Sequence, residues 1–561
     1  MKLLHKLGKV FRAYTDFEKA ISFACVGIVL LMVLKMVIFP YGLFNLGEDD
    51  VYTEGLVGPN GFQNINPLFV DYNYLDREVC SLVFSGLMRY DSEAKAIVED
   101  MATLTINSDK TEYTFVLKDN LKWQDGTPLT ADDVYFTFAI VVQDPTFVNE
   151  ILKADFDGVK IEKTDEKTIK FKLSKPNVFF ITSLATGILP KHILGNVSVE
   201  DLLQNSFNKK PIGSGPYQVS EPVQSFKDGR MQVTLKLNQY YYGVNPKIEN
   251  FRFISYPTMD QLFAEINAVN GIPKVSGEYA DQIKKSGSFV MIPYQLPQYM
   301  AVFLNMDSPQ LQDSRIRIAL QKSIDKNELL SRLSDKVPVD TPLLELNQSQ
   351  WIYQPSMDNA NGAVFEAGYK YKNPKDVYRK DSKGNIIELK LLARKFADGD
   401  APPTEQDEET NIVLKFLQEK WKSIGIKVDT EILPVDEFNE RVMDRAYDLL
   451  FIGQTLGYNL DTYSYWHSTQ VGSNGLNLSN YKSFQVDSLI EDIRSTFDSA
   501  QREKKLSMIA EKISKDVPAI FLYKPIYYYA SDGKVQGIDM DRSAFSSDRF
   551  SNISEWMFSS K

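Results

Sequence analysis

The sequence predicts an α/β protein with more than one lobe. Strand patterns begin at Ile387, Val428 and Tyr447, and helical patterns lie between them. Strands that alternate with helices in this way build a parallel sheet that is covered on both faces. A chain of 561 residues is too long for one hydrophobic core, so two or three lobes are expected.

The composition argues against several classes of function. The net charge of −11 disfavours a nucleic-acid groove, which needs basic stripes, so no nucleic-acid partner is expected. The three histidines and two cysteines leave little room for a zinc site. A calcium site made of carboxylates alone stays open. Cys25 lies in an apolar N-terminal run, so no disulfide with Cys80 is expected. We therefore expect no cofactor.

The N-terminus has the pattern of a membrane anchor. Residues 20–39 form an apolar run of the length that a helix needs to cross a bilayer. Basic residues precede this run and are absent from the stretch that follows it until Arg77. This asymmetry predicts a cytoplasmic tail over 1–19, a single transmembrane helix over 20–39, a linker over 40–52 and a body outside the cell. A cleaved signal peptide is the alternative, but no small-residue cleavage site follows the run.

The stretch from Tyr113 to Phe138 combines a strand, a turn and a helix. Residues 113–117 alternate in polarity, as a strand with one buried face does. Residues 125–128 (Asp-Gly-Thr-Pro) are typical of a turn. Thr130 is then placed to cap a helix that continues to Val142.

The same stretch carries a family resemblance. The string W-x-D-G-x-P-L-T-A-D-D-V-x-F, from Trp123 to Phe136, resembles the signature of the extracellular solute-binding proteins of family 5, the oligopeptide and dipeptide class. Gly213 to Tyr217 and Asn238 to Pro246 match later signatures of that family in the same order. The resemblance covers roughly residues 52–530. Proteins of this family are the capture subunits of ABC importers.

The resemblance implies a two-lobed periplasmic-binding-protein fold of type II (Venus flytrap) with an inserted accessory domain, preceded here by the N-terminal transmembrane helix. Lobe I is expected to comprise residues 53–88, 184–295 and 530–561. The accessory domain is expected at 89–183 and lobe II at 296–529.

The implied function is that of a membrane-anchored extracellular solute-binding protein. It would capture peptides or similar solutes in a cleft between the lobes, with the permease and ATPase subunits of an ABC importer as partners. A surface receptor or sensor that binds a small solute without transport is one alternative, and a surface hydrolase is another. The chain has no G-x-S-x-G elbow, no H-E-x-x-H motif and no Cys/His couple, so we do not expect an enzyme.

The resemblance also implies where a ligand binds. An extended peptide pairs with strand edges from both lobes, and the expected edges are Phe62, Gln63 and Asn64 on one wall and Gln454, Thr455 and Leu456 on the other. Further candidates are Asn305, where the second lobe begins, and Tyr458 and Trp466 on an aromatic rim. Gly457 occupies the position where the family has an aspartate for the ligand's amine. Asp461 is the nearest acid and therefore the candidate for that role.

Overall fold

The computed structural model describes residues 51–559 apart from Tyr72, Lys95, Glu345, 347–352, Asp398, 400–402, 459–460, Asn474 and Arg542. The chain divides into two compact units, residues 1–51 and 52–561. The predicted anchor at residues 20–39 lies outside the described residues. Of the helices in the described part of the chain, none combines the length and the apolar character needed to span a bilayer.

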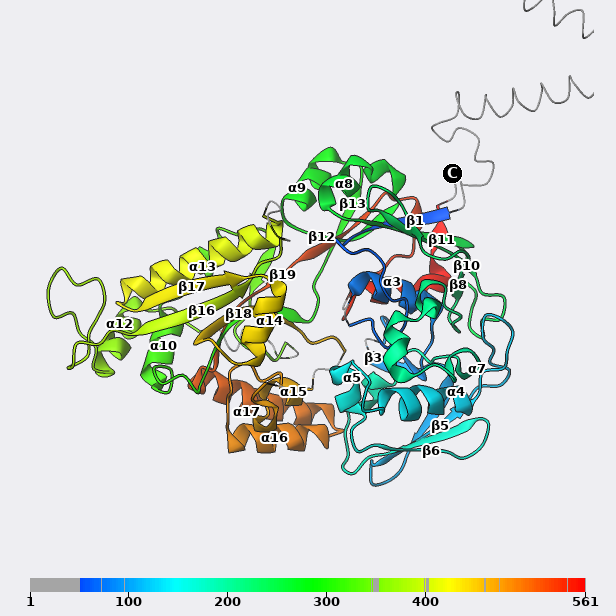
Figure 1. Ribbon diagram of the computed structural model, residues 1–561, viewed down its shortest axis with the longest axis horizontal. Coiled ribbons are helices and arrows are strands. Elements are labelled where there is room, and N and C mark those ends of the chain that lie inside the picture. Colours follow the sequence, from blue (N-terminus) through cyan, green and yellow to red (C-terminus); the bar gives the residue numbers. More distant parts are fainter. Residues whose placement is uncertain are drawn as a thin grey trace, which may run out of the picture. The chain divides into compact units, whose positions relative to one another are not determined.

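An eight-stranded sheet is assembled from segments that are far apart in the sequence (Figure 1). Its strands are β1 (Val51–Val57), β8 (Tyr217–Val219), β9 (Gln224–Ser225), β10 (Met231–Leu237), β11 (Asn250–Tyr256), β12 (Gly271–Val275), β13 (Val290–Tyr294) and β20 (Tyr527–Ser531). The order is β13-β20-β12-β1-β11-β10-β8, and β9 pairs with β10. β1 runs parallel to β12, whereas β20 runs antiparallel to both β12 and β13.

A six-stranded sheet forms from the second half of the chain. Its strands are β14 (Gln298–Leu304), β15 (Lys336–Pro338), β16 (Glu388–Arg394), β17 (Lys427–Leu433), β18 (Leu449–Thr455) and β19 (Ala519–Pro525), in the order β15-β19-β14-β18-β16-β17. The predicted parallel arrangement is confirmed for β16, β17 and β18. The other three strands, β14, β15 and β19, come from outside the alternating segment and pair antiparallel.

Helices cover both faces of the six-stranded sheet, as the alternating pattern predicts. They are α10 (Ser314–Lys322), α11 (Lys326–Leu330), α12 (Met357–Glu366), α13 (Glu405–Ser423), α14 (Val435–Met443), α15 (Tyr463–Trp466), α16 (Phe484–Arg494) and α17 (Ser499–Asp516). Along β14, Val302 packs in the core with Trp421 of α13, whereas Phe303 packs in the core with Ile490 of α16. Successive side chains of a strand point to opposite faces, so one strand contributes to two cores.

Local capping sets the helix boundaries in this half of the chain. The apolar pattern from Arg315 to Leu330 is continuous, but it forms two helices, α10 and α11, because the Asp325 side chain caps the second one. α13 begins at Glu405, after a capping box begun by Thr404. Asp436 lies inside the first turn of α14.

A third sheet has four antiparallel strands. Its strands are β4 (Ala102–Ile106), β5 (Glu112–Leu117), β6 (Lys160–Lys163) and β7 (Thr168–Lys172), in the order β4-β5-β7-β6. The predicted helix is confirmed: Thr130 caps α4 (Ala131–Tyr135) in a reciprocal capping box with Asp133. It continues to Val142 as a π-helix. α5 (Glu150–Asp155) and α6 (Phe180–Ser183) follow and face the candidate site.

The remaining elements connect these sheets. They are α3 (Tyr74–Val83), the hairpin of β2 (Met88–Asp91) and β3 (Ala96–Glu99), α7 (Lys191–Leu194), α8 (Met259–Ala264), α9 (Gly277–Ser286), the 3₁₀-helices Val199–Gln204, Ser206–Lys209, Ile266–Ala268, Ser468–Gln470 and Ser546–Glu555, and the pair β21 (Val535–Gln536) and β22 (Met557–Phe558).

The end of α3 is fixed by two segments that carry the family resemblance. The carbonyl of Val83 accepts hydrogen bonds from the Gly215 amide at 2.8 Å and from the Gln124 side chain at 3.0 Å. A Cβ added at Gly215 would lie 2.6 Å from the Leu82 carbonyl oxygen. The glycine loop is therefore a packing requirement, and it satisfies a carbonyl that the helix leaves without a partner.

A buried charge cluster ties the C-terminal segment to this region. Arg549 is fully buried and pairs with Glu54 of β1 and with Glu78 of α3. Ser546 also donates a hydrogen bond to Glu78. This cluster holds the turn at Phe545 beside α3, where it becomes part of the candidate site.

Candidate functional site

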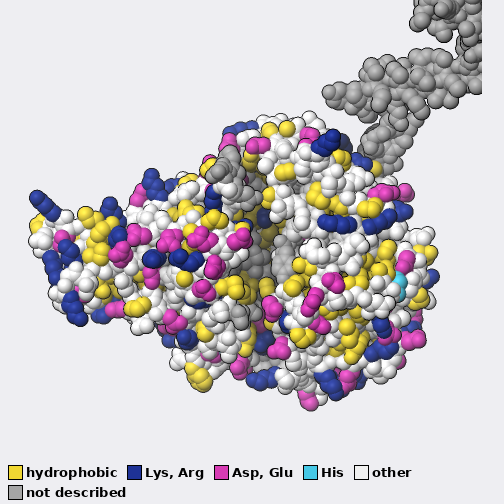
Figure 2. Space-filling model, in the orientation of Figure 1, with side chains coloured by type: hydrophobic (Ala, Val, Ile, Leu, Met, Phe, Trp, Pro, Cys, Tyr) yellow, Lys and Arg dark blue, Asp and Glu magenta, His cyan; other side chains and the backbone are white. Residues whose placement is uncertain are grey.

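The structure contains a cavity of about 510 Å³. Its lining comes from four separate stretches of the chain, 67–84, 151–187, 455–476 and 545–547. Figure 2 shows the surface hollowed between α14 and α3, with hydrophobic side chains at the edges of the hollow. Cavities of this size with apolar walls and a few polar groups are typical of small-ligand sites.

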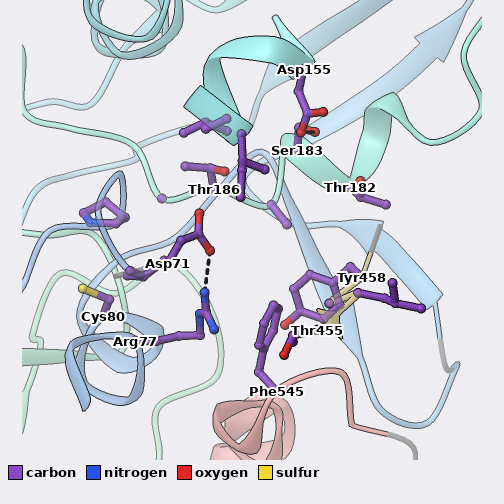
Figure 3. Close-up of a pocket in the computed structure, with 18 of the residues that line it drawn as sticks. Asp71, Arg77, Cys80, Asp155, Thr182, Ser183, Thr186, Thr455, Tyr458 and Phe545 are labelled. Atoms are coloured by element: carbon purple, nitrogen blue, oxygen red, sulfur yellow. Dashed lines mark hydrogen bonds and ion pairs between the residues drawn. The ribbon is translucent and has the colours of Figure 1, made fainter. Parts of the chain in front are cut away.

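One wall carries an ion pair between Arg77 of α3 and Asp71. The Arg77 guanidinium lies 2.5 Å from the Asp71 carboxylate and 3.9 Å from the centre of the Phe545 ring (Figure 3). Asn149 orients the other oxygen of Asp71 by donating to it at 3.0 Å. Among the described residues that line the cavity, Arg77 is the only cation.

A second wall carries Asp155, the last residue of α5. Its carboxylate accepts a hydrogen bond from the Ser183 hydroxyl at 2.6 Å, and Figure 3 shows the two side chains together, apart from the Asp71–Arg77 pair. Burial, together with the nearby charges of Asp461 and Asp71, raises the pKa of Asp155 to about 6, against the lowering effects of Ser183 and Arg494. Asp155 makes no ion pair with any residue that the structure describes.

Asp461 lines the cavity too, but its charge is balanced inside the protein. Its carboxylate lies 2.9 Å from Nε of Arg494 on α16 and accepts a hydrogen bond from the Tyr463 amide at 3.1 Å. Burial raises its pKa, against the lowering effect of Arg494.

Gly457 and Tyr458 lie at the turn that follows β18, and both line the cavity. Tyr458 donates a hydrogen bond to Asp548 and stacks on Tyr90 with ring centres 5.2 Å apart. Gly457 has a φ of +59°, and a Cβ there would lie 2.7 Å from the Phe545 ring. This close approach and the positive φ both require glycine.

The strand that leads into this turn has an open edge. β18 pairs with β14 along its whole length, from Leu449 to Thr455, but its pairing with β16 ends at Leu450. The two parallel strands therefore diverge beyond that point, and no described strand covers that side of 451–455. Thr455 and Leu456 line the cavity, whereas Gln454 accepts a hydrogen bond from Tyr299 on β14.

The wall expected from Phe62, Gln63 and Asn64 lies elsewhere. None of these residues lines the cavity, and the Phe62 side chain is fully buried. The amides of Gln63 and Asn64 donate to the Asp76 carboxylate at 3.0 and 2.8 Å. Their backbone donors are therefore already used within the protein.

The candidates Asn305 and Trp466 do not line the cavity and make contacts inside the protein. The Asn305 side chain donates to the carbonyls of Arg445 and Tyr447 at 3.2 and 3.0 Å, which holds the end of β14 to the entry of β18. Trp466 is buried between Phe303 and Phe521 and lies outside the main cavity.

Several lining residues were missed in the sequence. Asp71, Arg77, Asp155, Ser183 and Phe545 show no motif that singles them out. The acid at the end of the helical pattern around Asp155 is a weak signal, since acids are disfavoured at a helix C-terminus and therefore point to another role.

The described residues that line the cavity include few groups suited to covalent catalysis. Cys80 lines it, but burial raises the pKa of its thiol well above the usual value, so it stays protonated. Of the two described histidines, neither His192 nor His467 lines the cavity. The described residues contain no group of three or more His, Cys, Asp or Glu side chains arranged to hold a metal ion.

The fold and the cavity define an α/β substrate-binding protein, and comparisons with known proteins identify its family. Residues 96–475 match the bacterial extracellular solute-binding proteins, family 5 (middle part). The chain belongs to this family.

Among curated relatives, the oligopeptide-binding protein AppA of Bacillus subtilis is 29% identical over 450 residues, which cover 76% of this chain and 77% of AppA. The structure of AppA in complex with a nonapeptide matches with a TM-score of 0.72 and 24% identity, over 91% of this chain and 99% of that one. The structure of NikZ from Campylobacter jejuni in complex with Ni(L-His) matches with a TM-score of 0.73 and 25% identity, over 90% of this chain and 99% of NikZ.

Proposed function

We propose that this solute-binding protein captures peptides in the cavity and delivers them, chemically unaltered, to the permease and ATPase of an ABC importer. The observation that carries the proposal is the open edge of β18 at the cavity wall. An extended peptide adds to such an edge through main-chain hydrogen bonds, which are independent of its side chains. The name of the AppA relative points to the same class of ligand.

We assign the lobes by their sheets. The eight-stranded sheet belongs to lobe I (53–88, 184–295 and 530–561), the four-stranded sheet to the accessory domain (89–183) and the six-stranded sheet to lobe II (296–529). We move the last boundary back to Tyr527, because β20 begins there and pairs within the eight-stranded sheet. In this assignment the cavity lies between lobes, so closure of a hinge would enclose the ligand.

Within the cavity we assign peptide-backbone binding to Thr455 and Leu456, with Gly457 and Tyr458 closing one end. Gln454, Asn305 and Trp466 support these residues from behind. The opposite wall is supplied by α3 and the loop before it, in place of Phe62, Gln63 and Asn64. Asp76 engages the amides of Gln63 and Asn64.

We further propose that residues 20–39 anchor the protein in the cell membrane, with residues 1–19 in the cytoplasm and the body outside the cell. The apolar run and the basic residues before it support this topology. A protein tethered in this way stays near its transporter at the membrane surface.

Binding without catalysis is favoured over hydrolysis by the chemistry of the lining. The Ser183 hydroxyl donates a hydrogen bond to the Asp155 carboxylate, and neither described histidine lines the cavity to act as a general base. A receptor that signals without transport is distinguished by its partners, since co-purification of a permease and an ATPase would argue against it.

Native mass spectrometry tests the proposal. Full-length protein in detergent is incubated with an equimolar mixture of dialanine to hexaalanine and maltose, and the retained masses are measured. We expect one or more of the peptides to be retained and maltose to be absent. Retention of maltose alone, or of nothing, would contradict peptide capture.

A further inference from the structure

The charged groups around the cavity leave one carboxylate without a counter-ion. Asp71 is paired with Arg77, and Asp461 is paired with Arg494. Among the described residues, Asp155 has the Ser183 hydroxyl as its hydrogen-bond partner, and that neutral donor does not compensate its charge. The carboxylates of Asp71, Asp155 and Asp461, counted with Arg77 and Arg494, therefore sum to a net charge of −1 when all are ionised, which attracts a cation.

We propose that Asp155 is the acceptor for a primary ammonium group of the ligand, so that the accessory domain takes part in ligand recognition. This inference rests on the proposed function of the cavity as a peptide site. It transfers to Asp155 the amine role expected for Asp461, and it places that role on α5 instead of on the loop after β18.

Geometry separates Asp155 from the other two acids. Asn149 and Arg77 hold the two oxygens of Asp71, and Arg494 and the Tyr463 amide hold those of Asp461. One oxygen of the Asp155 carboxylate accepts a hydrogen bond from the Ser183 hydroxyl. Figure 3 shows the Asp155 side chain on the cavity wall.

The environment of Asp155 makes an incoming ammonium favourable. The charges that surround it are the carboxylates of Asp71 and Asp461 and the guanidinium of Arg494, and the phenol of Tyr465 lies nearby. Burial raises the pKa of Asp155, because the ionised carboxylate is less stable there than in water. A ligand ammonium would supply a charge-assisted hydrogen bond, which is the strong class of such bonds.

Two sources of ammonium fit this chemistry, the N-terminus of a peptide and the side chain of lysine. Calorimetry with three probes separates them: Ala-Ala-Ala, N-acetyl-Ala-Ala-Ala and N-acetyl-Ala-Lys-Ala. Each is titrated at neutral pH into the full-length wild type, Asp155→Asn and the control Asp157→Asn. Asp157 is exposed, lies two residues away and does not line the cavity.

We expect Asp155→Asn to weaken the binding of an ammonium-bearing probe by roughly tenfold or more, and to leave fully acetylated Ala-Ala-Ala nearly unchanged. The control should behave as the wild type. Preference of the wild type for Ala-Ala-Ala assigns the N-terminus, and preference for the lysine probe assigns the side chain. Equal binding of all three probes to the wild type, or an equal loss for all three in Asp155→Asn, would overturn the inference.

A second measurement distinguishes failure of the proposed peptide function from failure of the cation site. If no peptide probe binds the wild type, cadaverine tests the cation site alone by thermal denaturation. A rise in Tm in the wild type that is absent in Asp155→Asn keeps the cation site and rejects the peptide. The absence of any rise in the wild type rejects both.

Discussion

At the scale of single residues, the pairing of Asp461 with Arg494 decides how the cavity's acids divide their roles. An ion pair whose carboxylate is buried is sensitive to the loss of one partner, because the other charge is left uncompensated. Asp461 therefore contributes to the stability of the loop after β18, and the charge available for a ligand lies on Asp155.

Asp461→Asn is expected to lower the free energy of unfolding by about 1–3 kcal/mol, since Arg494 loses its partner and is itself partly exposed. Urea denaturation measures this change. Binding of free and N-acetylated peptides should change by the same factor. A loss confined to the free peptide would return the amine role to Asp461.

The raised pKa of Asp155 predicts how the stability of the folded protein depends on pH. Its folded-state pKa of about 6 lies above the usual 3.8, so the folded protein holds this proton more tightly than the unfolded chain. The ionised group thus lowers stability at neutral pH, and this cost disappears as the pH falls through 6 towards 4.

Asp155→Asn is therefore expected to raise the free energy of unfolding at neutral pH by about 1–2 kcal/mol, and to leave it unchanged near pH 4. Urea denaturation at both pH values checks this, with Asp157→Asn as the control. A variant that is less stable than the wild type at neutral pH would show that Asp155 is a structural acid.

At the scale of elements, the glycine loop after Ile212 positions α3, and α3 positions Arg77. The loop satisfies the Val83 carbonyl and approaches the helix so closely that a side chain cannot fit. The family signature around Gly215 therefore supports the site through packing.

Gly215→Ala is expected to lower the free energy of unfolding by roughly 3 kcal/mol, because its Cβ would collide with backbone atoms that cannot rotate away. The matched control is Gly362→Ala in α12, where no atom lies within 4 Å of the new Cβ. That substitution should stabilise by about 0.5–1 kcal/mol, the cost of glycine within a helix. Equal effects at the two positions, measured by thermal denaturation, would contradict this account.

Local signals predicted local structure well, and long-range proximity poorly. The cap at Thr130 and the strands at Leu389 and Val428 follow from spacing within a few residues. The break at Asp325 is also local, but a continuous apolar pattern concealed it. Asp155 of α5 lies near Asp461 only because segments from distant parts of the chain pack together, and no spacing within the sequence encodes that approach.

At the scale of the whole molecule, the contact between Tyr458 and Asp548 joins the turn after β18 to the C-terminal segment. Asp548 also accepts hydrogen bonds from the amides of Ala544 and Phe545, at 2.7 and 2.9 Å. Through the buried Arg549 this segment is tied to β1 and α3. We therefore interpret the Tyr458–Asp548 contact as one that joins two walls of the cavity.

Tyr458→Phe is expected to keep the ring packing and to remove only this hydrogen bond. The contact between the two walls then weakens by about 1–3 kcal/mol, and peptide affinity should fall by roughly tenfold or more, mainly through faster dissociation. Stopped-flow measurement of dissociation checks this. Tyr279→Phe, which breaks a tyrosine–aspartate bond at Asp260 away from the cavity, should leave dissociation unchanged.

A crystal structure of the full-length protein with bound Ala-Ala-Ala tests the central claim most directly. We expect the intact peptide in the cavity, paired with the open edge of β18 at Thr455, with its ammonium at Asp155. A peptide bound at another surface, or density for cleaved fragments, would contradict the account.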